Sequence, residues 1–177
     1  MKNKLKIVFA GSPKSSSTIL QSLIDNSDVE VPCVISQEPK RAKRGNKLLP
    51  TEVAIKATEN DIDLLEPRSL DEIKESITGF DFDFLLVAAY GKILPDWMLS
   101  APAYEPINVH YSILPKHRGA SPIQSTILAG DTVAGISIMK MTKGLDEGPI
   151  YKKFKIDIKE SDKEELEDKL SVIAAKN

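Results

Sequence analysis

Hydrophobic residues along the chain gather in short runs that alternate with amphipathic segments. Apolar runs or alternating stretches that are bounded by glycine, proline or polar residues predict strands. Six such strands are expected, at Leu5–Ala10, Val29–Ser36, Phe82–Ala89, Ile107–Ser112, Gly135–Met141 and Pro149–Ile158. The last two follow one another directly, and we expect them to form an antiparallel pair.

Helical spacing of apolar residues occurs between the expected strands. The first helix follows the turn Gly11-Ser12-Pro13, and others begin at Thr51, Ser69–Glu72, Asp96, Pro122 and Ser161–Glu164. Residues 37–50 are basic and contain a glycine, so they are expected to form a loop. The alternation of strands and helices predicts an α/β domain with a Rossmann-like, mostly parallel sheet flanked by helices.

The composition is that of one compact domain. The chain has 177 residues, of which 41% are hydrophobic and 28% charged, so a disordered tail or a fibre is excluded. Its longest apolar runs are far shorter than the roughly 20 residues of a membrane helix. The single cysteine, Cys33, cannot form an internal disulfide, and with two histidines the chain is poor in soft metal ligands. We expect a cytoplasmic protein that binds no membrane and no metal.

The glycine turns of the sequence fit neither of two common nucleotide-binding motifs. Gly11-Ser12-Pro13-Lys14-Ser15 lacks the second and third glycines of a dinucleotide fingerprint, so nicotinamide binding is not expected. Gly91-Lys92 has neither the upstream glycine nor the following Ser or Thr of a Walker loop. ATP hydrolysis is therefore not expected either.

The expected strand Ile107–Ser112 carries an unusual row of polar residues. Asn108, His110 and Ser112 alternate with apolar residues, so in a strand they point to one face. Ligands of open α/β sheets bind at the carboxyl ends of the strands. The three residues are therefore candidates for a site, although Asn108 and His110 taken alone are better explained as caps of neighbouring loops.

Several ordered blocks carry a resemblance to a known family. They are the Asn-x-His-x-Ser-x-Leu-Pro pattern, Arg-Gly-Ala-x-Pro-Ile and Leu-Asp-x-Gly-Pro-Ile, with supporting segments at Val8–Gly11, Arg44–Pro50 and Ala89–Pro95. Together they span nearly the whole chain. The sequence resembles the folate-dependent formyltransferases, and within that family the catalytic domain of the methionyl-tRNA formyltransferases.

The resemblance implies a catalytic triad of Asn108, His110 and Asp146, which moves a formyl group from 10-formyltetrahydrofolate to an amine and releases tetrahydrofolate. The residue types suit the chemistry. An amide donates a hydrogen bond to the oxyanion that develops on the formyl oxygen, and a histidine titrates near neutral pH. A carboxylate beside that histidine fixes its orientation. Asp146 taken alone is equally compatible with a loop cap, and His117 is expected to be a solvated loop residue.

The resemblance also implies a folate pocket. Its expected residues are Tyr90, Gly91, Ile93, Leu94 and Met141, with Ser112, Ile113, Leu114 and Pro115 lying along the same cofactor. A flat pterin needs an apolar slot with backbone hydrogen bonds, which a tight glycine loop provides. For Ile93 and Leu94 the alternative is ordinary anchoring of the loop in the core.

A cluster of five positive charges lies within eight residues of an otherwise acidic chain whose net charge is −2. It consists of Lys40, Arg41, Lys43, Arg44 and Lys47. By resemblance this basic loop binds the acceptor arm of the initiator methionyl-tRNA, because phosphates attract lysine and arginine. On spacing alone, the cluster is an ordinary solvated loop.

The expected domain organisation differs from that of the family. Residues 1–177 are expected to form the catalytic domain, without the carboxyl-terminal β-barrel domain of the tRNA enzymes. Three alternatives remain: a glycinamide ribonucleotide formyltransferase, a sugar-amine formyltransferase, and a catalytically weak truncated module that binds folate or RNA. The sequence gives no oligomeric state.

Overall fold

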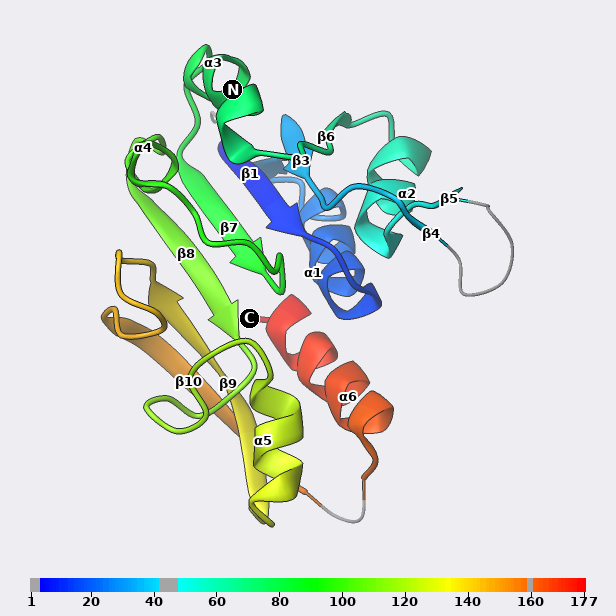
Figure 1. Cartoon of the computed structure of the whole chain (residues 1–177), viewed down its shortest axis with the longest axis vertical. Coiled ribbons are helices and arrows are strands. Elements are labelled where there is room, and N and C mark those ends of the chain that lie inside the picture. Colours follow the sequence, from blue (N-terminus) through cyan, green and yellow to red (C-terminus); the bar gives the residue numbers. More distant parts are fainter. Residues whose placement is uncertain (1–3, 42–47, 159–160) are drawn as a thin grey trace.

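One twisted sheet runs through the computed structural model of the chain, which describes residues 4–41, 48–158 and 161–177 (Figure 1). The strands lie in the order β10-β9-β8-β7-β1-β3-β6, and β2 also pairs with β1. Their bounds are Leu5–Gly11 for β1, Val29–Glu30 for β2, Cys33–Ile35 for β3, Asp63–Leu65 for β6, Phe84–Ala88 for β7, Glu105–His110 for β8, Val133–Lys140 for β9 and Ile150–Asp157 for β10. The strands from β6 to β8 are parallel, whereas β9 and β10 are antiparallel to their neighbours. The predicted mostly parallel sheet and antiparallel closing pair are confirmed.

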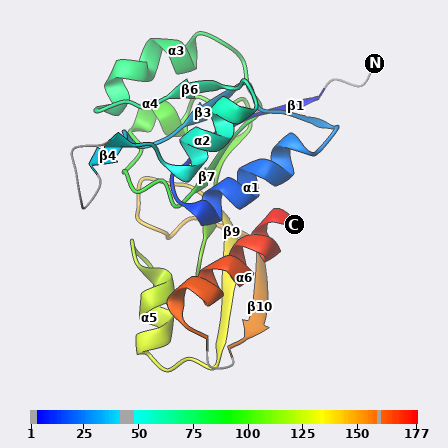
Figure 2. The ribbon, with the colours of Figure 1, turned by 90° about the vertical axis from the view of Figure 1, so that its right-hand side faces the viewer.

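Helices cover the two faces of the sheet unequally. The first face carries α1 (Lys14–Ile24), α2 (Glu52–Glu59), α5 (Pro122–Leu128) and α6 (Lys163–Ala175). Figure 2 shows α1, α2 and α6 in front of the strands. The second face carries a 3₁₀ turn at Leu70–Ile73, α3 (Lys74–Thr78) and α4 (Asp96–Leu99), which pack on β1, β3 and β7. None of the helices within the described ranges has the length and apolar character needed to span a bilayer.

Side chains alternate along the strands, so the two faces of the sheet have separate hydrophobic cores, here called the first and the second core after the face on which each lies. On β1, Phe9 packs in the first core whereas Val8 and Ala10 pack in the second. On β8, Val109 belongs to the first core. Because side chains alternate, Asn108 and His110 point to the second face, beyond the part of it that α3 and α4 cover.

The glycine of the first turn has a packing role. A Cβ on Gly11 would lie 2.8 Å from Ser16 Cβ in α1 and 2.9 Å from the carbonyl oxygen of Ala88 at the end of β7. The Ser16 hydroxyl donates a hydrogen bond of 2.6 Å to the same carbonyl oxygen. Gly11 thus lets the start of α1 approach the ends of β1 and β7 closely, without the dinucleotide fingerprint that the sequence lacks.

The structure differs from the sequence prediction at several boundaries. The expected strand at Val29–Ser36 is split into β2 and β3 at Pro32, which has no N–H for the ladder. The two ends of the basic loop pair with each other as β4 (Lys40–Arg41) and β5 (Leu48–Leu49). The last helix is capped by Asp162, whose side chain accepts a hydrogen bond from the Glu165 N–H, rather than by Ser161.

Because α6 packs against the first face of the sheet, shortening one of its buried side chains is expected to lower stability strongly. Leu166 is fully buried, so Leu166→Ala is expected to lower the free energy of unfolding by about 2–5 kcal/mol, because it leaves a cavity. Leu128→Ala is the matched control: this side chain is 87% exposed, and its loss is expected to change stability by less than about 0.5 kcal/mol. Urea unfolding followed by circular dichroism measures both. Equal effects of the two substitutions would contradict the assigned packing of α6.

Candidate active site

A cavity of about 640 Å³ lies at the carboxyl edge of the parallel strands. It is bordered by the loop after β7, by β8, by the loop between β8 and α5, by the loop between β9 and β10, and by α5 and α6. Residues from these elements that line it include Tyr90, Gly91, Ile93, Leu94, Asn108, His110, Gly119, Gln124, Met141, Asp146, Lys163 and Glu167. The position agrees with the general location of ligands in open α/β sheets.

The three predicted triad residues meet at this cavity. Asp146 Oδ1 lies 3.6 Å from His110 Nδ1 and 3.5 Å from Asn108 Nδ2. The side chains of His110 and Asp146 are only 6% and 11% exposed. The 3.6 Å separation is longer than a hydrogen bond, as is common for catalytic groups without a bound substrate. The arrangement provides an amide donor, a titratable imidazole and a carboxylate within reach of one another.

Backbone groups of the loop between β8 and α5 hold two of these side chains. The Gly119 N–H donates a hydrogen bond of 2.8 Å to Asp146 Oδ2. His110 Nε2 lies 3.0 Å from the carbonyl oxygen of His117. Asp146 itself has a φ of 51°, a left-handed conformation that aspartate tolerates better than most residues. The loop between β8 and α5 therefore holds both His110 and Asp146.

His117 is not the solvated residue that the sequence analysis expects. Its ring Nε2 lies 2.7 Å from Asp131 Oδ2, and its side chain is 17% exposed. Asp131 also accepts a hydrogen bond from Lys116 Nζ. The sequence neighbours Lys116 and Arg118 suggested solvent exposure, but the partner Asp131 comes from the turn after α5, which a local pattern does not reveal.

The loop after β7 forms one wall of the cavity. Gly91 has a φ of +81°, which glycine adopts without strain. The Gln37 amide donates a hydrogen bond of 2.6 Å to the carbonyl oxygen of Tyr90 and so holds the loop. Leu94 is buried in the second core, whereas Ile93 is 87% exposed. Anchoring in the core thus describes Leu94 and not Ile93, which lies at the cavity rim.

The predicted folate residues 112–115 are not among the residues that line this cavity. Strand β8 ends at His110, so Ser112 lies beyond it and donates a hydrogen bond of 2.7 Å to the carbonyl oxygen of Lys116. Leu114 is buried, and its carbonyl oxygen accepts a hydrogen bond from Lys153 Nζ. Ile113 and Pro115 belong to the same turn. These four residues shape the loop that carries His117 and Gly119.

The helices supply a wall of the cavity that no sequence pattern predicts. Lys163 and Glu167 reach it from α6, and the Ser15 hydroxyl of α1 donates a hydrogen bond of 2.7 Å to Glu167 Oε1. Gln124 reaches it from α5. No local motif marks these residues, because their roles depend on where two helices meet the edge of the sheet.

Two residues of the predicted tRNA-binding loop lie within the described part of the chain. Lys40 and Arg41 form β4 and are exposed, as are Leu48 and Leu49 on the paired strand β5. Lys43, Arg44 and Lys47 lie outside the described residues.

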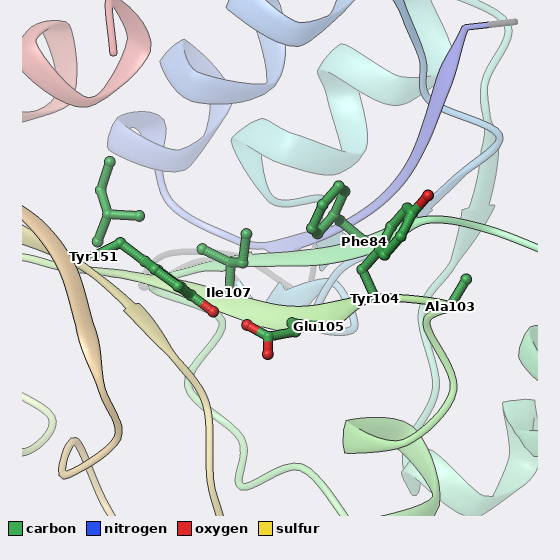
Figure 3. A pocket seen from close by; sticks show the side chains of 7 residues that line it. Phe84, Ala103, Tyr104, Glu105, Ile107 and Tyr151 are labelled. Atoms are coloured by element: carbon green, nitrogen blue, oxygen red, sulfur yellow. The ribbon is translucent and has the colours of Figure 1, made fainter.

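A second hollow, of about 610 Å³, lies beside the starts of β7 and β8 and is shown in Figure 3. Its lining includes Phe84, Tyr104, Glu105, Ile107, Ile138 and Tyr151. The Phe84 and Tyr104 rings stack with centroids 5.2 Å apart, and the Glu105 carboxylate pairs with Lys140 Nζ at 2.7 Å. It has an apolar wall and a satisfied ion pair, but no histidine and no amide side chain, so the triad cavity is the candidate active site.

Comparison with known proteins identifies the family of the chain. A family model described as formyl transferase matches residues 4–176. The chain belongs to the formyl transferase family. This family membership confirms the resemblance seen in the sequence blocks.

Curated relatives are about two-fifths identical to this chain over the aligned residues. It is 42% identical over 159 residues to a methionyl-tRNA formyltransferase of Mesoplasma florum, an alignment that covers 90% of this chain and 51% of the relative. It is 41% identical over 175 residues to a methionyl-tRNA formyltransferase of Dehalococcoides mccartyi, covering 97% of this chain and 55% of the relative. The chain thus spans about half the length of the curated relatives it matches.

Solved structures of formyl transferases share the fold. The glycinamide ribonucleotide transformylase 1 of Symbiobacterium toebii superposes with a TM-score of 0.79 at 22% identity, covering 98% of this chain and 83% of that one. The phosphoribosylglycinamide formyltransferase of Bacillus halodurans gives a TM-score of 0.78 at 24% identity, with 98% and 90% covered. At this identity the likeness shows the fold alone.

The buried hydroxyl of Tyr90 predicts a change in the pH dependence of stability. Burial raises the pKa of Tyr90 to about 12, and its Oη has no hydrogen-bond partner among the described residues. The tyrosine ionises near pH 10 in the unfolded chain and near pH 12 in the folded one. Its contribution to the free energy of unfolding is therefore complete below pH 10 and is lost between pH 10 and 12. Tyr90→Phe is expected to abolish the part of the stability loss above pH 10 that the Tyr90 hydroxyl causes.

The same substitution is expected to leave the free energy of unfolding at pH 7 unchanged or about 1 kcal/mol higher, since it removes a desolvated hydroxyl without a partner. Urea unfolding at pH 7, 10 and 11.5 compares the variant with the parent chain. The other buried titratable groups are present in both proteins and cancel in the difference. A parallel loss of stability in both proteins above pH 10 would refute the assignment.

Proposed function

We propose that this chain transfers the formyl group of 10-formyltetrahydrofolate to the α-amino group of methionyl-initiator-tRNA, in the cytoplasm, for translation initiation. The observation that carries the proposal is the meeting of Asn108, His110 and Asp146 at the cavity, with Asp146 Oδ1 within 3.6 Å of both partners. The identity of 40–45% to methionyl-tRNA formyltransferases supports the choice of acceptor. Residues 1–177 are proposed to form the catalytic domain for this reaction.

Asn108 is proposed to stabilise the oxyanion. Attack of the amine on the formyl carbon makes a tetrahedral intermediate whose oxygen carries negative charge. The Asn108 amide donates a hydrogen bond to that oxygen, and one such donor is typically worth about 3 kcal/mol in the transition state. Its amide nitrogen is 3.5 Å from Asp146 Oδ1, a weak contact that leaves it available to a stronger acceptor.

His110 and Asp146 are proposed to move the protons. The amine loses a proton as it becomes an amide, and N10 of the folate gains one as the carbon–nitrogen bond to the formyl group breaks. His110 accepts the first proton and, with Asp146 and a bridging water, returns one to the leaving nitrogen. Proton number is thereby conserved within the site. Burial of both side chains excludes bulk water and strengthens their interaction with the reacting atoms.

The cavity fits the proposed folate. Its volume lies within the usual range for pockets that hold small organic ligands. Leu94 and Met141 provide apolar surface beside the loop at Gly91, and Ile93 at the rim adds an exposed apolar side chain. When bound, 10-formyltetrahydrofolate supplies the activated formyl group. The predicted contacts of Ser112, Ile113, Leu114 and Pro115 are not part of this proposal.

The proposed acceptor is favoured by charge. Lys40 and Arg41 are exposed on β4, at one end of the basic loop, where phosphates of a tRNA acceptor arm would be attracted. A glycinamide ribonucleotide is the second candidate acceptor, because the structures that share the fold at TM-scores of 0.78–0.79 include glycinamide ribonucleotide transformylases.

An acceptor screen tests the function. The chain is incubated with 10-formyltetrahydrofolate and, in separate reactions, with charged initiator methionyl-tRNA, glycinamide ribonucleotide or an amino sugar, and tetrahydrofolate release is followed by absorbance. We expect turnover with methionyl-tRNA and at least about 10²-fold lower kcat for His110→Ala and Asp146→Ala, the usual size of acid–base contributions.

Matched controls accompany the screen. Unchanged circular dichroism spectra show that each variant folds, and His110→Ala is tested for retained folate binding by calorimetry. Turnover with glycinamide ribonucleotide alone would replace the proposed acceptor with the second candidate. Folate binding without turnover for any acceptor would identify a binding module instead of an enzyme.

Removal of one basic side chain from β4 tests the contact with tRNA. Lys40→Ala and Arg41→Ala are each expected to raise KM for the tRNA several-fold with little change in kcat, and to reduce the slope of log affinity against log salt by about one. Lys176→Ala, at the far end of α6, is the control for the loss of one positive charge. Equal salt slopes for Lys40→Ala, Arg41→Ala and the control would rule out phosphate contacts by these residues.

A further inference from the structure

The contact between His110 and the backbone of His117 fixes which ring nitrogen of His110 carries a proton. His110 Nε2 lies 3.0 Å from the His117 carbonyl oxygen. A carbonyl oxygen only accepts hydrogen bonds, so the nitrogen that faces it must donate. Because its partner is the His117 carbonyl oxygen, we assign a proton to Nε2 in both the neutral and the charged ring.

The assignment leaves Nδ1 as the ring nitrogen that can accept a proton. A neutral imidazole carries one N–H, so with Nε2 protonated the lone pair is on Nδ1. Nδ1 lies 3.6 Å from Asp146 Oδ1, the only charged group within ion-pair distance of the ring among the described residues. A proton accepted from the substrate amine would therefore be bound between Nδ1 and the Asp146 carboxylate.

The His117 carbonyl oxygen is itself held in place by a side-chain pair. His117 has a φ of 54°, an uncommon left-handed conformation for a histidine. Its ring Nε2 donates to Asp131 Oδ2 at 2.7 Å, and Lys116 Nζ pairs with the other oxygen at 3.1 Å. The hydrogen bonds from His117 and Lys116 lower the pKa of the Asp131 carboxyl, which keeps it ionised at neutral pH. Asp131 belongs to the turn between α5 and β9.

The same loop orients the other partner of His110. Gly119, two residues after His117, donates its N–H to Asp146 Oδ2 at 2.8 Å. The start of the loop is fixed by Ser137, whose hydroxyl donates to the Ser112 carbonyl oxygen at 2.7 Å and accepts from the Leu114 N–H. A shift of the loop at His117 would thus disturb both the acceptor of Nε2 and the carboxylate that faces Nδ1.

We propose that Asp131 is a positioning residue for the transfer reaction: by binding the His117 ring it holds the His117 carbonyl oxygen on Nε2 of His110, so that Nδ1 is the proton-accepting atom. The role of this atom in turnover rests on the function proposed above. The protonation site of His110 is independent of that function and is measurable without substrate.

The test follows the protonation site and turnover together. Two-dimensional ¹H–¹⁵N spectra of the imidazole nitrogens distinguish the two neutral forms of His110, with assignment from the spectrum of His110→Ala. In the parent chain we expect a neutral His110 protonated at Nε2. In Asp131→Ala we expect a mixture of both forms, together with kcat lower by about tenfold or more at an unchanged KM for the folate, because the catalytic atom is misplaced.

Conservative and distant variants separate positioning from a general effect. Asp131→Asn keeps an oxygen that accepts from the His117 ring, so it is expected to restore most of the Nε2 form and of kcat. Asp25→Ala removes an exposed carboxylate at the end of α1 and is expected to match the parent chain in both measurements. Because the spectrum of the parent chain is itself a test, the proposal remains falsifiable if Asp131→Ala fails to fold.

Two results would overturn the proposal: a neutral His110 protonated at Nδ1 in the parent chain, or an Asp131→Ala variant whose His110 keeps the parent spectrum. The expected spectra without turnover on any acceptor would instead count against the proposed function alone and leave the assignment of His110 intact. Normal turnover with unchanged spectra in Asp131→Ala would support the function and reject the positioning role.

Discussion

The site depends on one face of β8 being left without a covering helix. In a parallel α/β sheet, crossover helices normally cover both faces, and a strand in its interior is then apolar on both sides. Here α3 and α4 cover the second face over β1, β3 and β7. The next strand after β8 in the sheet, β9, runs antiparallel to it. Asn108 and His110 therefore meet loops instead of a helix. Polar side chains in the interior of the sheet are stable there because the loops supply hydrogen-bonding partners and a cavity.

A single carboxylate interacts with both other polar side chains of the site. One carboxylate, Asp146, faces both the amide of Asn108 and the imidazole of His110, while a backbone N–H satisfies its other oxygen. Backbone groups are fixed donors and acceptors that do not titrate, so they orient the titrating side chains at every pH. The hydrogen bond that supports the loop, between His117 and Asp131, lies outside the set of groups that would exchange protons with the substrate.

Elements with strong local signals were predictable from the sequence, and contacts between distant segments were not. The apolar run of β1, the Thr51 cap of α2 and the stripe of α6 are local features, and the structure has all three. The row at Asn108 and His110 was found because alternation is a property of the strand itself. The partner of His117 and the helix residues that line the cavity depend on tertiary packing. The end of β8 at His110 likewise removed Ser112 from the row, because the chain turns there to form the supporting loop.

The outer strand β10 has a further consequence for the behaviour of the chain in concentrated solution. It forms one edge of the sheet, and its sequence carries Lys152, Lys153 and Lys155 on an exposed stretch of backbone. An edge strand has unpaired N–H and C=O groups that can form hydrogen bonds with a strand of another molecule. Lysines on the edge oppose such pairing, because their charges repel one another and would lose hydration. The opposite edge, β6, is only three residues long. Both borders of the sheet thus disfavour the strand-to-strand aggregation to which open sheets are prone.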